Sequence, residues 1–154
     1  MFTKSEEDIP FVKSIINEQF SQLRPEHQVF VRSIGTPIAF ANSTATVKFL
    51  QHGAEGSEFE TLWYLWRHCQ DHPTDKVVYL HSKGSFHPSE TNNKLRRFLT
   101  RGALSQECAN APSSCNVCSS RISPIPHPHM SGNMWLADAT TFKSSLIPCP
   151  LSHK

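Results

Sequence analysis

Apolar residues recur every three or four positions in three stretches of the chain, which is the spacing of one face of a helix. The pattern predicts helices over residues 9–23, 57–70 and 89–104. The apolar face of the first helix consists of Val12, Ile15, Ile16, Phe20 and Leu23. The residues of the third helix that we expect to face inward are Leu95, Phe98 and Leu99.

The second predicted helix, over residues 57–70, carries apolar residues on more than one side. We therefore expect it to be well buried, with Trp63 and Trp66 in the core and not on the surface as stacking platforms. Ser57 and Glu60 have the spacing of a capping box at its start.

Runs of β-branched and aromatic residues predict strands over residues 28–34 and 77–80. Residues 46–50 fit either another short strand or part of a loop. Residues 121–129 contain alternating prolines, so we expect them to be extended or at a sheet edge. The alternation of helices and strands indicates an α/β fold with a mostly parallel sheet flanked by helices.

The chain has 154 residues, the length of a single domain, here 1–154. We expect a final helix over 138–146 and a frayed tail over 148–154. The net charge is +2 and no stripe of lysine and arginine is present, which argues against nucleic-acid binding. No apolar run has membrane-spanning length, and residues 1–8 lack the hydrophobic core of a signal peptide.

Polar residues follow the strand predicted over 77–80, in the order His81, Ser82, Lys83 and Gly84. Ligands of α/β proteins collect at the carboxyl ends of strands, and a glycine there lets the backbone turn sharply or approach a ligand. We interpret this segment as the floor of a binding site, although an ordinary polar turn has a similar composition.

The basic helix after this segment adds to the same hypothesis. Lys83 and an arginine such as Arg97 could together hold phosphate groups. The segment is not a P-loop, because the required pattern of glycines and Lys-Ser/Thr is missing.

A second candidate segment is Ser131-Gly132-Asn133-Met134-Trp135. Small residues followed by large apolar ones suggest a backbone that approaches a ligand and then a buried wall. Asn133 offers both hydrogen-bond donors and an acceptor. A tight turn before a packed segment explains the pattern equally well.

The five cysteines leave three alternatives open for the segment around Cys108, Cys115 and Cys118. These are a disulfide, buried free thiols, or a structural zinc site completed by His127 and His129. No Asp-x-Asp, paired-carboxylate or Ser/His/Asp motif stands out, so we expect neither a carboxylate metal site nor a cofactor.

Two of these segments together resemble a family of glycosyltransferase-like proteins of the GT-A type. Val77–Gly84 resembles the family's YLHTKG-type strand end, and His129–Ala137 resembles its H-x-SGNFWWA-type segment. The tryptophan-rich stretch Leu62–Cys69 fits the helix before the first motif. The resemblance covers roughly Phe59–Phe142, just over half of the chain.

The resemblance implies a GT-A-like fold and transfer of a sugar from a nucleotide-sugar donor to an acceptor. It implies that Lys83 stabilises the diphosphate leaving group without a metal, and that His81 assists the phosphate or carries a proton. The residues expected to contact substrate are Ser82, Gly84, Arg97, Ser131, Gly132, Asn133 and Trp135.

A GT-A domain opens with a strand that grips the nucleotide base, whereas the first element that we predict here is a helix. We therefore expect the domain to be either incomplete at its N-terminus or divergent, with an incomplete donor site. The alternative functions are a non-catalytic relative that binds glycan or protein, and a small zinc-binding interaction module.

Overall fold

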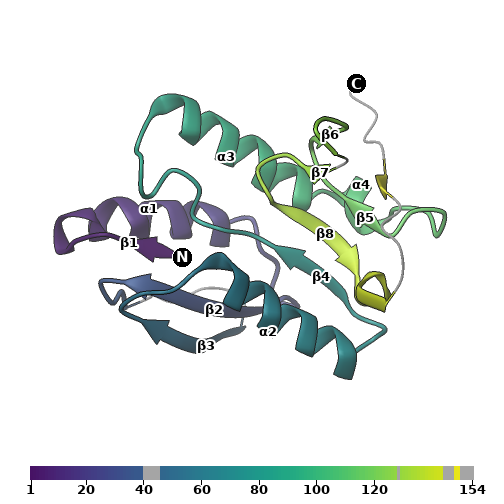
Figure 1. Cartoon of the computed structure of the whole chain (residues 1–154), viewed down its shortest axis with the longest axis horizontal. Helices are drawn as coiled ribbons and strands as arrows, with labels where there is room; N and C mark the ends of the chain where they lie inside the picture. The colour runs from purple at the N-terminus through teal and green to yellow at the C-terminus, as the bar shows by residue number, and fades with distance from the viewer. Residues whose placement is uncertain (40–45, 128, 144–147, 150–154) are drawn as a thin grey trace. The chain divides into compact units, whose positions relative to one another are not determined.

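The computed structural model describes residues 1–39, 46–127, 129–143 and 148–149, and it has a mixed α/β architecture (Figure 1). The chain forms two compact units. The first unit contains residues 1–61 and 82–93, and the second contains residues 62–81 and 94–154.

The first unit is built on a parallel sheet with the strand order β1-β2-β3. Its elements are β1 (Phe2–Thr3), η1 (Glu6–Asp8), α1 (Ile9–Phe20), β2 (Gln28–Gly35), β3 (Thr46–Gly53) and the start of α2 (Glu58–Asp71). The helix α1 connects two neighbouring parallel strands, so β1, α1 and β2 form a βαβ unit.

The apolar face predicted for α1 forms the core of this unit. Val12 and Ile16 are buried against Ile38. Ser5 begins the preceding 3₁₀ turn, where its backbone N–H and its hydroxyl both donate to a carboxylate oxygen of Asp8, at 3.1 and 2.9 Å.

An ion pair joins the start of α2 to β2. The side chain of Arg32 is only 2% exposed, and its guanidinium bonds to the Glu60 carboxylate and donates to the Ser57 carbonyl at 3.1 Å. Glu60 also accepts from the Ser57 backbone N–H at 3.0 Å, as the predicted capping box requires.

The second unit holds a four-stranded sheet with the order β4-β8-β5-β9. Its strands are β4 (Lys76–Tyr79), β5 (Val117–Cys118), β8 (Trp135–Asp138) and β9 (Pro148–Cys149), and β6 (Ile122–Ser123) pairs separately with β7 (His129–Met130). The strand β8 is antiparallel to β4 and β5, whereas β5 and β9 are parallel. The unit also contains two complete helices, α4 (Gln106–Ala109) and the 3₁₀ helix η2 (Ala139–Lys143). Most of α2 and most of α3 (Glu90–Ala103) belong to it as well.

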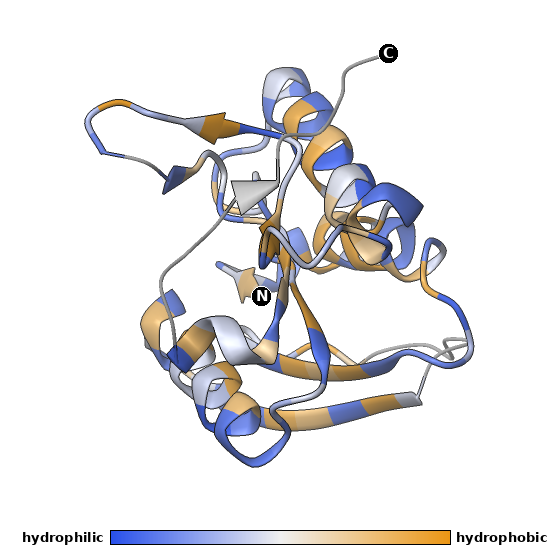
Figure 2. Ribbon diagram, turned by 90° about the vertical axis from the view of Figure 1, so that its right-hand side faces the viewer, coloured by the Kyte–Doolittle hydropathy of each residue, from blue (hydrophilic) through white to orange (hydrophobic). Residues whose placement is uncertain are grey.

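The three predicted helices and the strands over 28–34 and 77–80 are confirmed, and residues 46–50 belong to a strand. Hydrophobic and hydrophilic residues are interspersed along the helices, as expected for amphipathic helices (Figure 2). Among the described residues, β6 and β7 form a separate two-stranded sheet, in line with the extended structure expected from the prolines of this segment. The expectation of a mostly parallel sheet holds for the first unit, whereas the four-stranded sheet of the second unit is mixed.

Several expectations are wrong. Trp63, Trp66 and Phe98 are 44%, 45% and 46% exposed, so none of them lies in the core. A strand does precede the first helix, since Phe2–Thr3 pairs with the end of β2. Such a two-residue strand is too short for its pattern to be recognised.

Two predictions for the C-terminal part of the chain, a helix and a frayed tail, also need correction. The predicted helix over 138–146 is a 3₁₀ helix over Ala139–Lys143, and residues 144–147 lie outside the described residues. Pro148–Cys149 pairs with β5 and is therefore not frayed, whereas 150–154 are again outside the described part. No helix within the described ranges is both long and apolar enough to span a bilayer.

Candidate functional site

The carboxyl ends of β1 and β2 meet the segment that follows β4. Thr3 and Gly35 are partners in the parallel pairing of these strands. The backbone N–H of Phe2 donates to the hydroxyl of Ser82 at 3.2 Å, which fixes the segment beside β1 within the first unit. The arrangement is the one at which ligands bind in α/β proteins.

Residues Ser82–Ser85 form a tight turn at this place. The Ser85 N–H donates to the Ser82 carbonyl at 2.9 Å, and the two hydroxyls lie 3.1 Å apart. Gly84 is the third residue of the turn and has φ of +87°, which only glycine adopts without strain. The prediction of a sharp turn at Gly84 is confirmed, and the turn places Lys83 at its second position.

The sequence interpretation missed the groups that β1 contributes here. Lys4 follows β1, and its ammonium lies 5.6 Å from the centre of the Phe86 ring, which also contacts the Phe2 ring edge-on at 5.2 Å. A Cβ on Gly35 would stand 2.0 Å from the Thr3 carbonyl oxygen, so Gly35 permits the close approach of the chains. Gly35 could have been recognised from the sequence, because it is the glycine that ends the strand predicted over residues 28–34.

The second candidate segment forms a turn of the same kind in the second unit. The Asn133 N–H donates to the Met130 carbonyl at 3.1 Å, and Gly132 is the third residue, with φ of +84°. The Ser131 N–H donates to the carbonyl of Arg121 at 3.0 Å. Both glycine-containing motifs are therefore turns that require a left-handed residue.

His81 reaches this second turn. Its Nε2 lies 2.8 Å from the Gly132 carbonyl oxygen, and because that oxygen can only accept, Nε2 carries the proton. His81 and the Ser131–Trp135 segment are therefore neighbours within the second unit.

Aromatic rings also connect His81 to the Ser131–Trp135 segment. The Tyr79 ring stacks with the His81 ring, at 6.3 Å between the ring centres, and with the Trp135 ring, at 5.6 Å. The indole N–H of Trp135 donates to Oδ1 of Asn133 at 3.0 Å, and Asn133 has φ of 52°, which is uncommon for a residue with a side chain. Trp135 is only 7% exposed, so it is a core residue as well as a neighbour of the turn.

The predicted site residues therefore fall into two groups. Ser82, Lys83 and Gly84 lie in the first unit, whereas His81 and the Ser131–Trp135 segment lie in the second. Arg97 belongs to the second unit, on α3, and its side chain is exposed.

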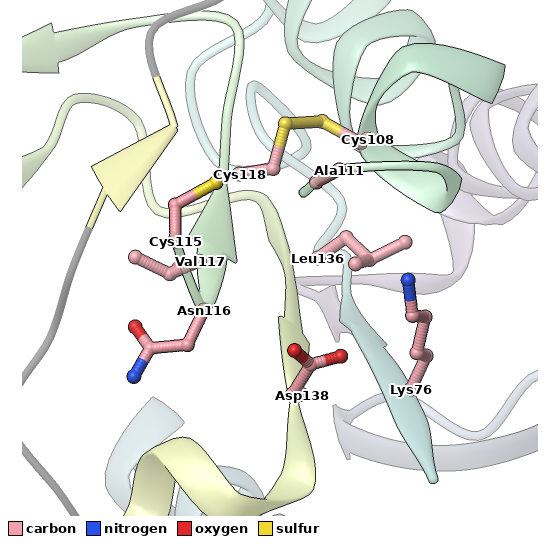
Figure 3. A pocket seen from close by; sticks show the side chains of 9 residues that line it. All are labelled: Lys76, Cys108, Ala111, Cys115, Asn116, Val117, Cys118, Leu136 and Asp138. Atoms are coloured by element: carbon pink, nitrogen blue, oxygen red, sulfur yellow. A yellow bond between two sulfur atoms is a disulfide. The ribbon is translucent and has the colours of Figure 1, made fainter. Parts of the chain in front are cut away.

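A small cavity of about 10 Å³ lies at the other end of strands β4 and β8, beside Lys76 and Asp138 (Figure 3). This volume is close to the least that holds one water molecule. None of the predicted site residues lines the cavity, so it is not the predicted pocket.

The cysteine alternatives are resolved in favour of a disulfide between Cys108 and Cys118, which are both buried. Cys115 is disulfide-bonded as well, so the thiolates of the suggested zinc site are engaged. Among the described residues, no group of three or more His, Cys, Asp or Glu side chains could hold a metal ion. Burial, and to a lesser extent the charge of Asp75, raises the pKa of the free Cys69 to about 11.

Comparison with known proteins places the chain in a family. A family model described as Domain of unknown function (DUF8361) matches residues 1–142, so the chain belongs to this family. No curated protein and no solved structure matches the chain. The description of the family specifies no reaction and no ligand.

Proposed function

We propose that this member of the DUF8361 family is a glycosyltransferase-like protein with a GT-A-type fold. It binds a nucleotide-sugar donor at the carboxyl ends of β1 and β2 and transfers the sugar to an acceptor. The observation that carries this proposal is the turn Ser82–Ser85, which is bonded to β1 beside the parallel β1–β2 pair. The resemblance of both glycine-containing motifs to glycosyltransferase-like proteins supplies the reaction class.

The parallel order β1-β2-β3, with α1 between the first two strands, supports donor binding at this edge. A GT-A domain opens with a strand and loop that grip the nucleotide base, and β1 with Lys4 occupies the corresponding place in our proposal. Lys83, on the turn bonded to β1, offsets the charge of the diphosphate as it leaves.

In this proposal His81 has mainly a positioning role. Its Nε2–H is engaged by the Gly132 carbonyl, so proton transfer to substrate through this nitrogen would require the contact to break. His81 instead fixes the turn that carries Ser131 and Asn133. Ser131, Gly132, Asn133 and Trp135 remain proposed sugar contacts. Arg97 remains a proposed phosphate contact.

The second candidate is a non-catalytic relative that binds glycan or protein. It is favoured by the internal bonding of the second turn, where the Gly132 carbonyl and Oδ1 of Asn133 already accept bonds from His81 and Trp135. Groups that hold each other in this way fit a structural role as well as a substrate-binding one.

Calorimetric titration with UDP, GDP, ADP and CDP tests the proposal. Lys83→Ala removes one charge-assisted contact, worth ~1.5–3 kcal/mol, so affinity for the bound diphosphate should fall roughly tenfold to a hundredfold. Lys83→Arg should restore part of the loss, because a planar guanidinium does not replace a compact ammonium. A chelator should leave binding unchanged.

Lys13→Ala is the matched control, because it removes the same charge from an exposed position on α1. It should bind like the wild type. Strong nucleotide binding that Lys83→Ala leaves intact would refute the role of the Ser82–Ser85 turn. Failure of the wild type to bind any nucleotide would favour the non-catalytic relative.

A further inference from the structure

Charged residues are unevenly divided between the two units of the chain. The second unit contains nine lysine and arginine residues against four aspartate and glutamate residues, a net charge of +5 with neutral histidines. The first unit contains six against nine, a net charge of −3. An excess of positive charge in one part of a chain is typical of a surface that meets a nucleic acid or a membrane.

One side of α3 carries a row of these positive charges. Leu99 and Ala103, on the opposite side, are fully buried in the core of the second unit. Lys94, Arg97 and Arg101 are exposed. Their spacing of three and four positions places them on the same side of the helix, along about 10 Å of its length.

An exposed aromatic ring and a fourth cation lie at the same part of α3. Phe98, four positions after Lys94, is 46% exposed. Its carbonyl oxygen accepts a hydrogen bond from the Ser120 hydroxyl at 2.9 Å, and Gly102 lets the two segments approach, because a Cβ there would collide with the Ser120 side chain. The exposed Arg121 follows Ser120 directly, so a second segment adds a cation next to this part of α3.

The combination favours the surface of an acidic phospholipid bilayer. Three of the four cations are arginines, whose guanidinium groups match phosphate oxygens. An apolar ring among cations fits the boundary between headgroups and acyl chains, where aromatic residues of basic helices are buried. Free phosphate compounds bind in concave sites, whereas the side of a helix is convex. Nucleic-acid strands are bound by longer basic grooves with several stacked aromatic rings, and α3 contains a single aromatic residue.

We propose that this cationic side of the second unit, defined by Lys94, Phe98, Arg101 and Arg121, binds the surface of membranes that contain acidic phospholipids. The three cations contact the phosphate and carboxylate groups of the lipids, and the Phe98 ring enters the layer between the headgroups. Ion pairs that exposed cations make within a chain are weak, so lipid headgroups replace such partners at little cost. Arg97 is left out of the definition as a proposed donor contact, and the inference does not depend on the transferase activity proposed above.

Sedimentation of the full chain with vesicles at physiological ionic strength tests the proposal. The protein should bind vesicles of equal parts phosphatidylserine and phosphatidylcholine, and should not bind vesicles of phosphatidylcholine alone. Arg101→Gln/Arg121→Gln should weaken this binding roughly twentyfold, since each cation near an acidic surface contributes about fivefold. Phe98→Ala should weaken it about fivefold, because the exposed part of the ring leaves water when it enters the layer.

Arg67→Gln/Lys143→Gln is the matched control, because it removes the same charge from exposed positions on the other side of the sheet of this unit. The helix α2 packs on the side of β4 that carries Val77, together with Phe142 of η2, whereas α3 packs on the side that carries Val78 (Figure 1). Charges on the far side of the sheet are screened at this ionic strength. The control should therefore bind the vesicles like the wild type.

Four results would overturn the proposal. The first is that acidic vesicles bind the protein no better than neutral vesicles do. The second is an equal loss in the two double variants, which would mean attraction by net charge alone. The third is unchanged vesicle binding by Phe98→Ala. The fourth is tighter binding of an oligothymidylate than of the acidic vesicles, weakened in the same way by Arg101→Gln/Arg121→Gln, which would assign this surface to nucleic acid.

Discussion

Replacement of Gly132 by alanine tests the geometry of the second turn. Gly132 has φ of +84°, and a Cβ at this position would stand 2.3 Å from Cδ1 of Leu99. Leu99 is fully buried, in a cluster with Ala103 and Met134, and has little room to move. Two separate costs therefore oppose the substitution.

The magnitude follows from these two costs. A left-handed backbone costs an L-residue such as alanine about 1–2 kcal/mol. Forcing a methyl group into a packed core costs about 1–3 kcal/mol. Gly132→Ala should thus lower the free energy of unfolding by about 2–5 kcal/mol, a large part of the stability of a chain of this size.

Urea unfolding followed by circular dichroism measures this loss. The Leu99→Ala variant separates the two costs, because it removes the side chain that the new methyl group would meet. In the Leu99→Ala background, Gly132→Ala should cost only the ~1–2 kcal/mol of the backbone term. The two substitutions should therefore be less than additive by about 1–3 kcal/mol.

Two results would refute this reasoning. A loss below about 0.5 kcal/mol for Gly132→Ala would mean that the turn is not left-handed at this residue. An equal loss in the wild-type and Leu99→Ala backgrounds would mean that Gly132 does not pack on Leu99.

Two further predictions concern the cysteines. The Cys108–Cys118 disulfide spans 10 residues, so Cys108→Ala/Cys118→Ala should lower the free energy of unfolding by about 3 kcal/mol in urea titration, and an unchanged midpoint would contradict the bond. For Cys69, the folded thiol has a pKa near 11, above its ordinary value of 9. The unfolded chain therefore releases this proton first, and stability should be complete below pH 9 and decline as the pH rises to 11. The decline should be smaller in Cys69→Ala, and identical pH profiles of the two proteins would contradict a raised pKa.

The positions of the main elements could be predicted from the sequence, because they depend on local spacing. The apolar period of residues 9–23 indicated α1, and the β-branched run at 77–80 indicated β4. Gly84 indicated a sharp turn, and a tight turn was one of the two explanations of the segment with Gly132, since a left-handed residue at the third turn position is a local requirement. These features need no knowledge of distant parts of the chain.

Which side of α2 is buried depended on tertiary structure. Its apolar residues occupy more than one side, so the helical period alone did not show that Leu62 and Leu65 would face the core and that Trp63 and Trp66 would be exposed. Only the position of the sheet beside the helix decides between such faces.

Pairing between distant segments was also decided by the tertiary structure. The sequence contains nothing local that sets β8 between β4 and β5, or joins Cys108 to Cys118 in preference to Cys115. The contacts of the candidate site are of the same kind, since His81 and Gly132 are separated by 51 positions. The sequence by itself thus determined the local turns and the residue types of the site, whereas their neighbours depended on long-range packing, which local patterns do not encode.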